Sequence, residues 1–233
     1  MRQTYLLLSA LLLLSTSCMI GVQGNGRVEE QKRQIESFES ISVSGMFEVY
    51  VRQGNSNTLR LVADENLHEL IETRVEGDRL YISTKETIGK AKELDVYLMV
   101  ENLKAIDASG AISLKSEGEI ESRDLRIESS GAAEIDLEVD VDDLIVETSG
   151  AAEIEMAGKA DRLRVETSGA AELSLFELEV NNCSVNTSGA AEVRVTVKDV
   201  LSVDASGAAD IRYRGNPELK RTDLSGAASL KKD

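Results

Sequence analysis

The segment Leu144-Ile-Val-Glu-Thr-Ser-Gly-Ala-Ala-Glu-Ile-Glu-Met156 alternates between two kinds of side chain. Its even positions include Val146 and Ile154, with small residues between them, whereas most of its odd positions are polar. Alternation with a period of two is typical of a β-strand with one buried face. The central Ser-Gly-Ala-Ala predicts a sharp bend, because small residues leave room and glycine tolerates unusual φ angles.

The tripeptide Ser-Gly-Ala recurs through the second half of the chain. It begins at Ser109, Ser130, Ser149, Ser168, Ser188, Ser206 and Ser225. A unit this short cannot bury its apolar face alone, so its neighbours must stack on it about 4.8 Å apart. Stacking would place Val146, Val165 and Val203 in one interior column, and no helical return segment of a leucine-rich repeat is visible. We therefore predict an all-β fold in which residues 104–233 form a parallel β-helix or β-solenoid with coils of about 19 residues.

The preceding part, residues 36–103, is predicted to be β-rich and to pack on one end or one side of the coils. Residues 38–51 contain Ser44-Gly45 and read as a divergent copy of the repeat. A short helix is expected over 64–71 with Asp64 as its cap, then a hairpin at Gly77-Asp78 and a loop over 84–92. The single histidine, His68, is expected on the surface of the short helix.

The N-terminus has the pattern of an export signal. Residues 1–17 contain one cation, a short apolar run and small residues, and they lead directly to Cys18. The run is too short to span a bilayer, which indicates a signal peptide. Small residues before a cysteine predict a lipoprotein signal with a lipid anchor on Cys18, and the alternative is a plain secretory signal. Residues 18–35 are expected to be a flexible tether, and Cys183, left without a partner, to be a buried small apolar residue.

The composition limits the function classes. The formal net charge is −16, so the chain is not expected to bind nucleic acid through its own field. No residue cluster of a metal site or a catalytic triad surrounds His68, and no glycine-rich loop opens a helix. We therefore predict no enzymatic activity and no cofactor, apart from the divalent cation considered below.

Two acidic ladders flank the repeated serine on the outer face. The first stands two residues before the serine and includes Glu128, Glu147, Glu166 and Asp204; the second stands four residues after it and includes Glu134, Glu153, Glu172, Glu192 and Asp210. Like charges side by side on a sheet are unfavourable. One interpretation is that the side chains splay and that Arg126, Arg164, Arg194 and Arg212 dilute the field. The other is that the ladders bind divalent cations, basic ligands or a partner surface.

The order of these motifs resembles the family named putative auto-transporter adhesin, head GIN domain. The resemblance covers residues 23–229 and rests on the lipoprotein cysteine, Phe38-x-x-Ile41-x-Val43-Ser-Gly, Gly77-Asp-Arg-Leu-Tyr-Ile82 and the Ser-Gly-Ala repeats. Members often have a proline before the leucine that precedes the first Ser-Gly-Ala, whereas this chain has Glu101-Asn102-Leu103. The resemblance implies a cell-envelope protein of Gram-negative bacteria with a β-helix-like fold, and it supplies no catalytic residues.

These observations together predict an exported cell-envelope lipoprotein, placed at the outer membrane, that acts as an adhesin or interaction module. Its expected partners are the membrane, through the lipid anchor, and a glycan or protein ligand. The alternatives are a polysaccharide-acting β-helix enzyme, a lyase or glycosidase, and a purely structural envelope spacer. A uniform row of carboxylates disfavours the enzyme, because a catalytic site should interrupt the repeat.

Overall fold

The computed structural model describes residues 21–233, and almost every element in them is a strand. The strands are β1 (Val22–Gln23), β2 (Val28–Arg33), β3 (Ser40–Gln53), β4 (Thr58–Asp64), β5 (Ile71–Glu76), β6 (Arg79–Thr84), β7 (Ile88–Lys90), β8 (Leu94–Val100), β9 (Ala105–Thr148), β10 (Ala151–Thr167), β11 (Ala170–Gly207), β12 (Asp210–Gly215), β13 (Glu218–Leu224) and β14 (Ser229–Lys232). The predicted all-β class is confirmed.

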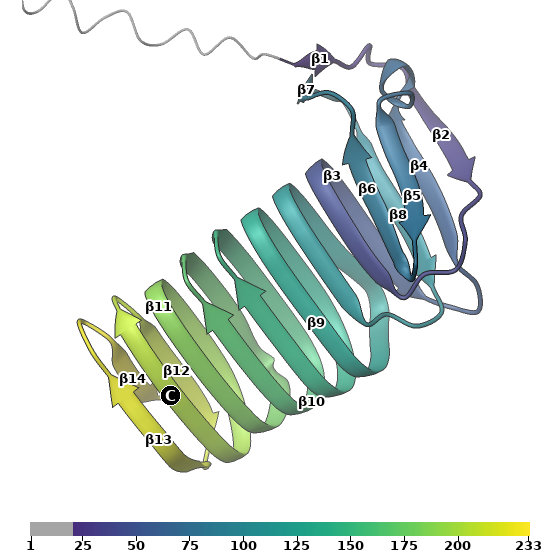
Figure 1. Ribbon diagram of the computed structural model, residues 1–233. Coiled ribbons are helices and arrows are strands. Elements are labelled where there is room, and N and C mark those ends of the chain that lie inside the picture. Colours follow the sequence, from purple (N-terminus) through teal and green to yellow (C-terminus); the bar gives the residue numbers. More distant parts are fainter. Residues whose placement is uncertain (1–20) are drawn as a thin grey trace, which may run out of the picture.

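The chain winds through a row of stacked coils, where one coil runs from one Ser-Gly corner to the next (Figure 1). β10 pairs in parallel with β9 on one side and with β11 on the other. Ala151 pairs with Ala132 and with Ala170, so equivalent residues of successive repeats lie side by side. At the corners the backbone stays bonded to the preceding coil, as in the 3.0 Å bond that the amide of Ala170 donates to the carbonyl of Gly150.

The interior of the coils is a narrow apolar core. The registers place Val146 beside Val165 and Val165 beside Val185, and all three side chains are buried. A second column joins Leu144, Leu163 and Cys183, as predicted. Burial raises the pKa of the Cys183 thiol to about 12, so this thiol behaves as an apolar side chain.

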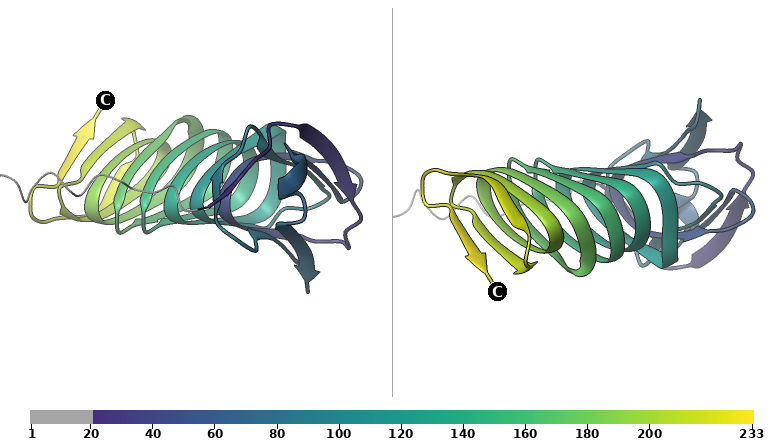
Figure 2. Two further views of the ribbon diagram at one scale, coloured as in Figure 1. Left: turned by 90° about the horizontal axis from the view of Figure 1, so that it is seen from above. Right: turned by 90° about the horizontal axis from the view of Figure 1, so that it is seen from below.

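The N-terminal strands, β1 to β8, close one end of the row of coils (Figure 2). We call this part of the chain, residues 22–100, the cap. β3 forms the first coil and pairs in parallel with β9 over residues 40–51, with Ser44 opposite Ser109. The sheet then continues through β8, which is parallel to β3, and through β4 and β2, which are antiparallel. The predicted hairpin is present, since β5 and β6 pair across Gly77-Asp78 and Gly77 has a φ of 66°.

Four local expectations for this cap are wrong. Two parts of the expected tether are strands, β1 (Val22–Gln23) and β2 (Val28–Arg33), and β2 supplies the partner that the edge of β4 needs. The helix over 64–71 reduces to the 3-10 helix η1 (Glu65–Leu67), without a side-chain cap from Asp64. His68 is buried, with its Nε2 3.0 Å from the carbonyl oxygen of Glu29. The loop over 84–92 contains β7, which pairs with β1.

Candidate functional site

The Ser-Gly corners separate two long grooves on the outer surface. The first, which we call the serine groove, has a volume of about 580 Å³ and contains the first acidic ladder. The second, which we call the alanine groove, has a volume of about 1090 Å³ and contains most of the second ladder. The strand alternation explains the arrangement, because residues two before and four after the serine point outward on opposite sides of each corner.

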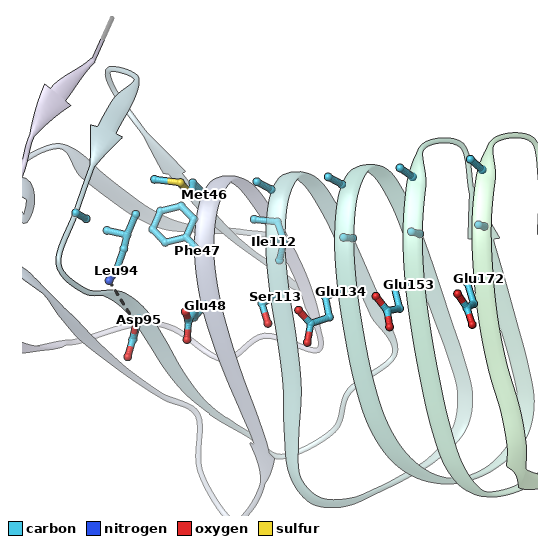
Figure 3. Close-up of a pocket in the computed structure, with 18 of the residues that line it drawn as sticks. Met46, Phe47, Glu48, Leu94, Asp95, Ile112, Ser113, Glu134, Glu153 and Glu172 are labelled. Atoms are coloured by element: carbon cyan, nitrogen blue, oxygen red, sulfur yellow. Dashed lines mark hydrogen bonds between the residues drawn. The ribbon is translucent and has the colours of Figure 1, made fainter. Parts of the chain in front are cut away.

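The alanine groove has an apolar floor and an acidic wall. Its floor is a row of exposed alanines contributed by successive coils: Ala111, Ala132, Ala151, Ala170 and Ala190. Glu134, Glu153 and Glu172 stand along the wall and point to the same side (Figure 3). Glu153 pairs in register with both Glu134 and Glu172, which sets these carboxylates at the strand spacing of about 4.8 Å.

The cap closes one end of this groove with apolar side chains. Phe47 and Leu94 are buried there, and Met46 is 40% exposed beside them (Figure 3). Glu48 and Asp95 pair in register across β3 and β8 and extend the acidic wall into the cap. Burial and the neighbouring Glu48 raise the pKa of Asp95.

These two acidic residues were not predicted as part of the site. Glu48 follows Ser44 at the same distance as Glu153 follows Ser149, so the divergent repeat contained the signal that would have found it. Asp95 lies outside any repeat, and only the pairing of β8 with β3 brings it to the groove.

Most of the predicted ladder carboxylates form ion pairs with cations of the same face. Arg126 contacts Glu128 and lies 2.6 Å from Glu147, while Arg194 bridges Glu172 at 2.8 Å and Glu192 at 2.7 Å. The other pairs are Arg164 with Glu166, Arg221 with Asp204, Lys115 with Glu134, and Arg212 and Lys231 with Asp210. Within residues 21–233, Glu153 has no such partner.

Asp210 is the most strongly stabilised carboxylate of the second ladder. Its side chain accepts a 2.6 Å hydrogen bond from the hydroxyl of Ser229 and lies 3.2 Å from both Arg212 and Lys231. These contacts, the Ser229 bond foremost, lower the pKa of Asp210 to about 2. Asp210 does not line the alanine groove, so the second ladder leaves the groove at its last coil.

The arrangement offers little to a single metal ion. Among residues 21–233, no three His, Cys, Asp or Glu side chains are arranged to hold one. The carboxylates instead form a row, which suits a ligand that lies along the coils and carries several hydrogen-bond donors or positive charges. Cation binding remains a hypothesis that a melting curve with calcium or chelator tests.

A column of buried hydroxyls lies beneath the serine groove. Thr148, Thr167 and Thr187 follow one another in register, and Ser129 precedes them in the repeat. All four hydroxyls are buried and have no hydrogen-bond partner in the described part of the chain. A buried hydroxyl without a hydrogen-bond partner lowers the stability of a folded protein, so this column is a destabilising feature of an otherwise apolar core.

A family model matches most of the chain. It covers residues 37–217 and is described as "Putative auto-transporter adhesin, head GIN domain". The chain belongs to this family. The resemblance inferred from the sequence motifs is therefore confirmed.

Solved structures of other proteins show the same fold. A "putative adhesin" from Bacteroides fragilis is 19% identical, with a TM-score of 0.85 over 91% of this chain and 100% of that chain. A "putative lipid binding protein" from Parabacteroides distasonis is 20% identical, with a TM-score of 0.68 over 91% of this chain and 99% of that chain. A "putative adhesin" from Parabacteroides merdae is 19% identical, with a TM-score of 0.68 over the same shares. Comparison with curated proteins finds no match.

The head GIN family relationship indicates an extracellular or envelope protein. Between residues 21 and 233 there is no helix long and apolar enough to cross a bilayer. The predicted lipidation site, Cys18, and the signal peptide lie outside the described residues.

Proposed function

We propose that this protein is a cell-envelope lipoprotein that acts as an adhesion or interaction module through the alanine groove. Its stacked coils then constitute a parallel β-solenoid that holds a ligand-binding surface away from the membrane. The observation that carries the proposal is the groove itself, whose acidic wall repeats from coil to coil and which the cap closes with Phe47 and Leu94.

The groove geometry favours an extended ligand over a small substrate. The floor presents methyl groups and the wall presents carboxylates at one strand spacing, so each coil offers the same pair of contacts. Carboxylates accept hydrogen bonds from sugar hydroxyls and from cationic side chains. A glycan or a basic protein segment lying across the coils would satisfy this pattern.

An array of glycans and matrix proteins tests the proposal. The mature protein should bind a subset of the array, and the triple variant Glu134→Gln, Glu153→Gln, Glu172→Gln should lose that subset. A matched control replaces three exposed carboxylates outside both grooves: Asp140→Asn, Asp142→Asn and Glu177→Gln. Unchanged binding by the first variant would disprove the role of the groove, and turnover of a polysaccharide would favour the enzyme class.

The lipid anchor has its own test. Cys18→Ala removes the predicted acylation site, so the variant should leave the membrane fraction. A variant that still sediments with membranes would contradict the anchor and would leave the groove proposal standing.

A further inference from the structure

A third groove lies in the cap, and it is basic in a strongly acidic chain. It has a volume of about 910 Å³ and is lined by residues of β2, β3, β4, β8 and β9, together with the segment after β2 and Asn57 before β4. Four cations contribute to it: Lys32, Arg33, Arg52 and Arg60. The formal net charge of the whole protein is −16, so the cations of this groove are opposite in sign to the protein as a whole.

Three of the four cations that line the basic groove have no carboxylate partner among the described residues, whereas Arg60 pairs with Glu30 at 3.2 Å. In the described part of the chain, every arginine except Arg33 and Arg52 forms an ion pair with a carboxylate, and both exceptions line this groove. Lys32 forms no ion pair with residues 21–233 either. Residues 1–20 contain no Asp or Glu that could supply a missing partner. Of these three cations, Lys32 and Arg52 are exposed, so the groove presents two uncompensated positive charges to solvent.

Arg33 is held rigidly within the cap. Its guanidinium is half-buried and donates hydrogen bonds to the carbonyls of Ile71 at 2.7 Å and His68 at 2.8 Å, and to the hydroxyl of Thr73 at 3.1 Å. Carbonyls and hydroxyls fix its orientation without neutralising it, and burial lowers the pKa of Arg33. Arg33 pairs in register with the buried Leu59, whereas Lys32 pairs with Arg60, so the Arg33 guanidinium lies on the opposite face of the sheet from these two cations.

An ordered stack of side chains forms one side of the groove. Arg60 lies 3.7 Å above the ring of Tyr97, and Tyr97 stacks on Tyr50 with ring centroids 4.8 Å apart. The register places Lys32 beside Arg60 and Arg52 beside Met99. Lys32 and Arg52 are both exposed, so their charged groups are accessible to a ligand.

The rim of the groove also carries negative charge. Glu30 and Glu117 line it together with the cations, and they would repel a continuous anionic surface such as a bilayer. The same carboxylates accept hydrogen bonds from hydroxyl groups. A ligand that carries both an anionic group and several hydroxyls fits this mixture better than a membrane does.

We propose that the basic groove binds acidic sugars of an oligosaccharide, with the exposed Lys32 and Arg52 contacting its anionic groups. Met99 and the exposed edge of the Tyr97 stack face the sugar ring. This site is separate from the alanine groove, so either proposal can fail while the other stands.

Binding of acidic hexasaccharides to the mature protein tests the site. The panel contains a uronate, a sulfated and a sialylated oligosaccharide, with neutral maltohexaose and anionic phosphatidylglycerol vesicles as further arms. At least one acidic member should bind more tightly than maltohexaose, and the affinity should fall as salt rises. Arg52→Gln with Lys32→Gln should weaken that binding about tenfold or more, because two charge-assisted contacts are lost.

The matched control is Arg123→Gln with Lys159→Gln, which removes the same charge from residues of the coils that do not line the groove. Unchanged melting curves of both variants show that each still folds. An equal loss in the control, no binding by any acidic member, or binding to the vesicles in place of the sugars would overturn the proposal. The triple glutamate variant of the alanine groove should leave this binding in place.

Discussion

Gly150 shows at the residue scale why the repeat contains glycine at its corner. A methyl group added to Gly150 would lie 2.1 Å from the carbonyl oxygen of Gly131, and one added to Gly169 would meet Gly150 in the same way. The corners of successive coils therefore approach too closely for any side chain. The close approach belongs to the stacking of the coils, since Gly150 itself has no positive φ.

Replacing Gly150 with alanine should therefore destabilise the protein by about 1–3 kcal/mol or more, since the backbone must shift to relieve the clash. Urea unfolding of the Gly150→Ala variant measures the change. Ala132→Ser is the control, because Ala132 is exposed at a neighbouring corner and should tolerate the hydroxyl. Equal stability of Gly150→Ala and the wild type would show that the corners are not packed as described.

Thr167 carries one of the buried hydroxyls without a partner. Valine has nearly the same shape and no polar group, so Thr167→Val should stabilise the protein by about 1 kcal/mol. Thr196→Val is the matched control, because the Thr196 hydroxyl donates a 2.8 Å bond to the carbonyl of Phe176 and its loss should destabilise. A destabilised Thr167→Val would mean that the hydroxyl column is hydrogen-bonded after all, for example to buried water.

At the scale of elements, Asp64 joins three parts of the cap. It lies at the end of β4, is buried, and accepts hydrogen bonds from the backbone amides of Gly26 and of Lys92, the latter at 2.7 Å. Burial by itself would raise the pKa of Asp64, but these amide bonds and the charge of Lys92 outweigh it and lower the pKa. The carboxylate thus connects the segment after β1 with the segment after β7.

The lowered pKa makes the cap sensitive to acid. An acid whose folded pKa lies below its unfolded value, here near 3.8, contributes stability above that value and loses it as the pH falls through the folded pKa. Asp64→Asn should therefore lower the free energy of unfolding at pH 7 by about 1–3 kcal/mol and flatten its decline below pH 4. Unfolding curves across pH measure both effects, with exposed Glu69→Gln as the control. An unaltered pH profile would contradict this role of Asp64.

The structure of the repeats was predictable because every repeat has the same alternation of apolar and polar side chains around Ser-Gly-Ala. Val146, Val165 and their equivalents share one position in the unit, so the inward face and the register follow from counting. The cap offered no such redundancy. The sequence Val-Glu-Glu-Gln-Lys-Arg of β2 has no apolar alternation, and only its pairing with β4, about thirty residues later, makes it a strand.

The candidate site, too, could be predicted from the sequence only in part. Its glutamates belong to the repeat and could be listed from the sequence. One interpretation from the sequence, that arginines dilute the field of the ladders, agrees with the ion pairs of Arg126 and Arg194. The sequence did not reveal that the two ladders occupy separate grooves. The basic groove was missed altogether, because Lys32, Arg60 and Arg52 reach one face only through long-range pairing of β2, β4, β8 and β3.

For the whole molecule, the register implies that a complete coil is a removable unit. Deleting residues 151–169 joins Gly150 to Ala170, which pairs with Ala151 and occupies the equivalent position. The shortened protein should fold cooperatively, with an m-value reduced roughly in proportion to the residues removed.

The control for this experiment deletes residues 151–160, about half a coil. That deletion breaks the register, so interior residues of one coil would face the corner of the next, and the protein should fail to fold. Circular dichroism and urea unfolding separate the two outcomes. If both deletions fold equally well, or if neither folds, the coils are not independent repeating units.

The central claim is that the acidic wall of the alanine groove is a binding surface of the intact envelope protein. The most direct measurement is the fraction of cells that adhere to a surface coated with the strongest ligand from the array. Cells with the triple variant Glu134→Gln, Glu153→Gln, Glu172→Gln should adhere no better than cells without the protein. Cells with the control variant Asp140→Asn, Asp142→Asn, Glu177→Gln should adhere like the wild type. Full adhesion by the triple variant, at equal amounts of protein on the cells, would contradict the account.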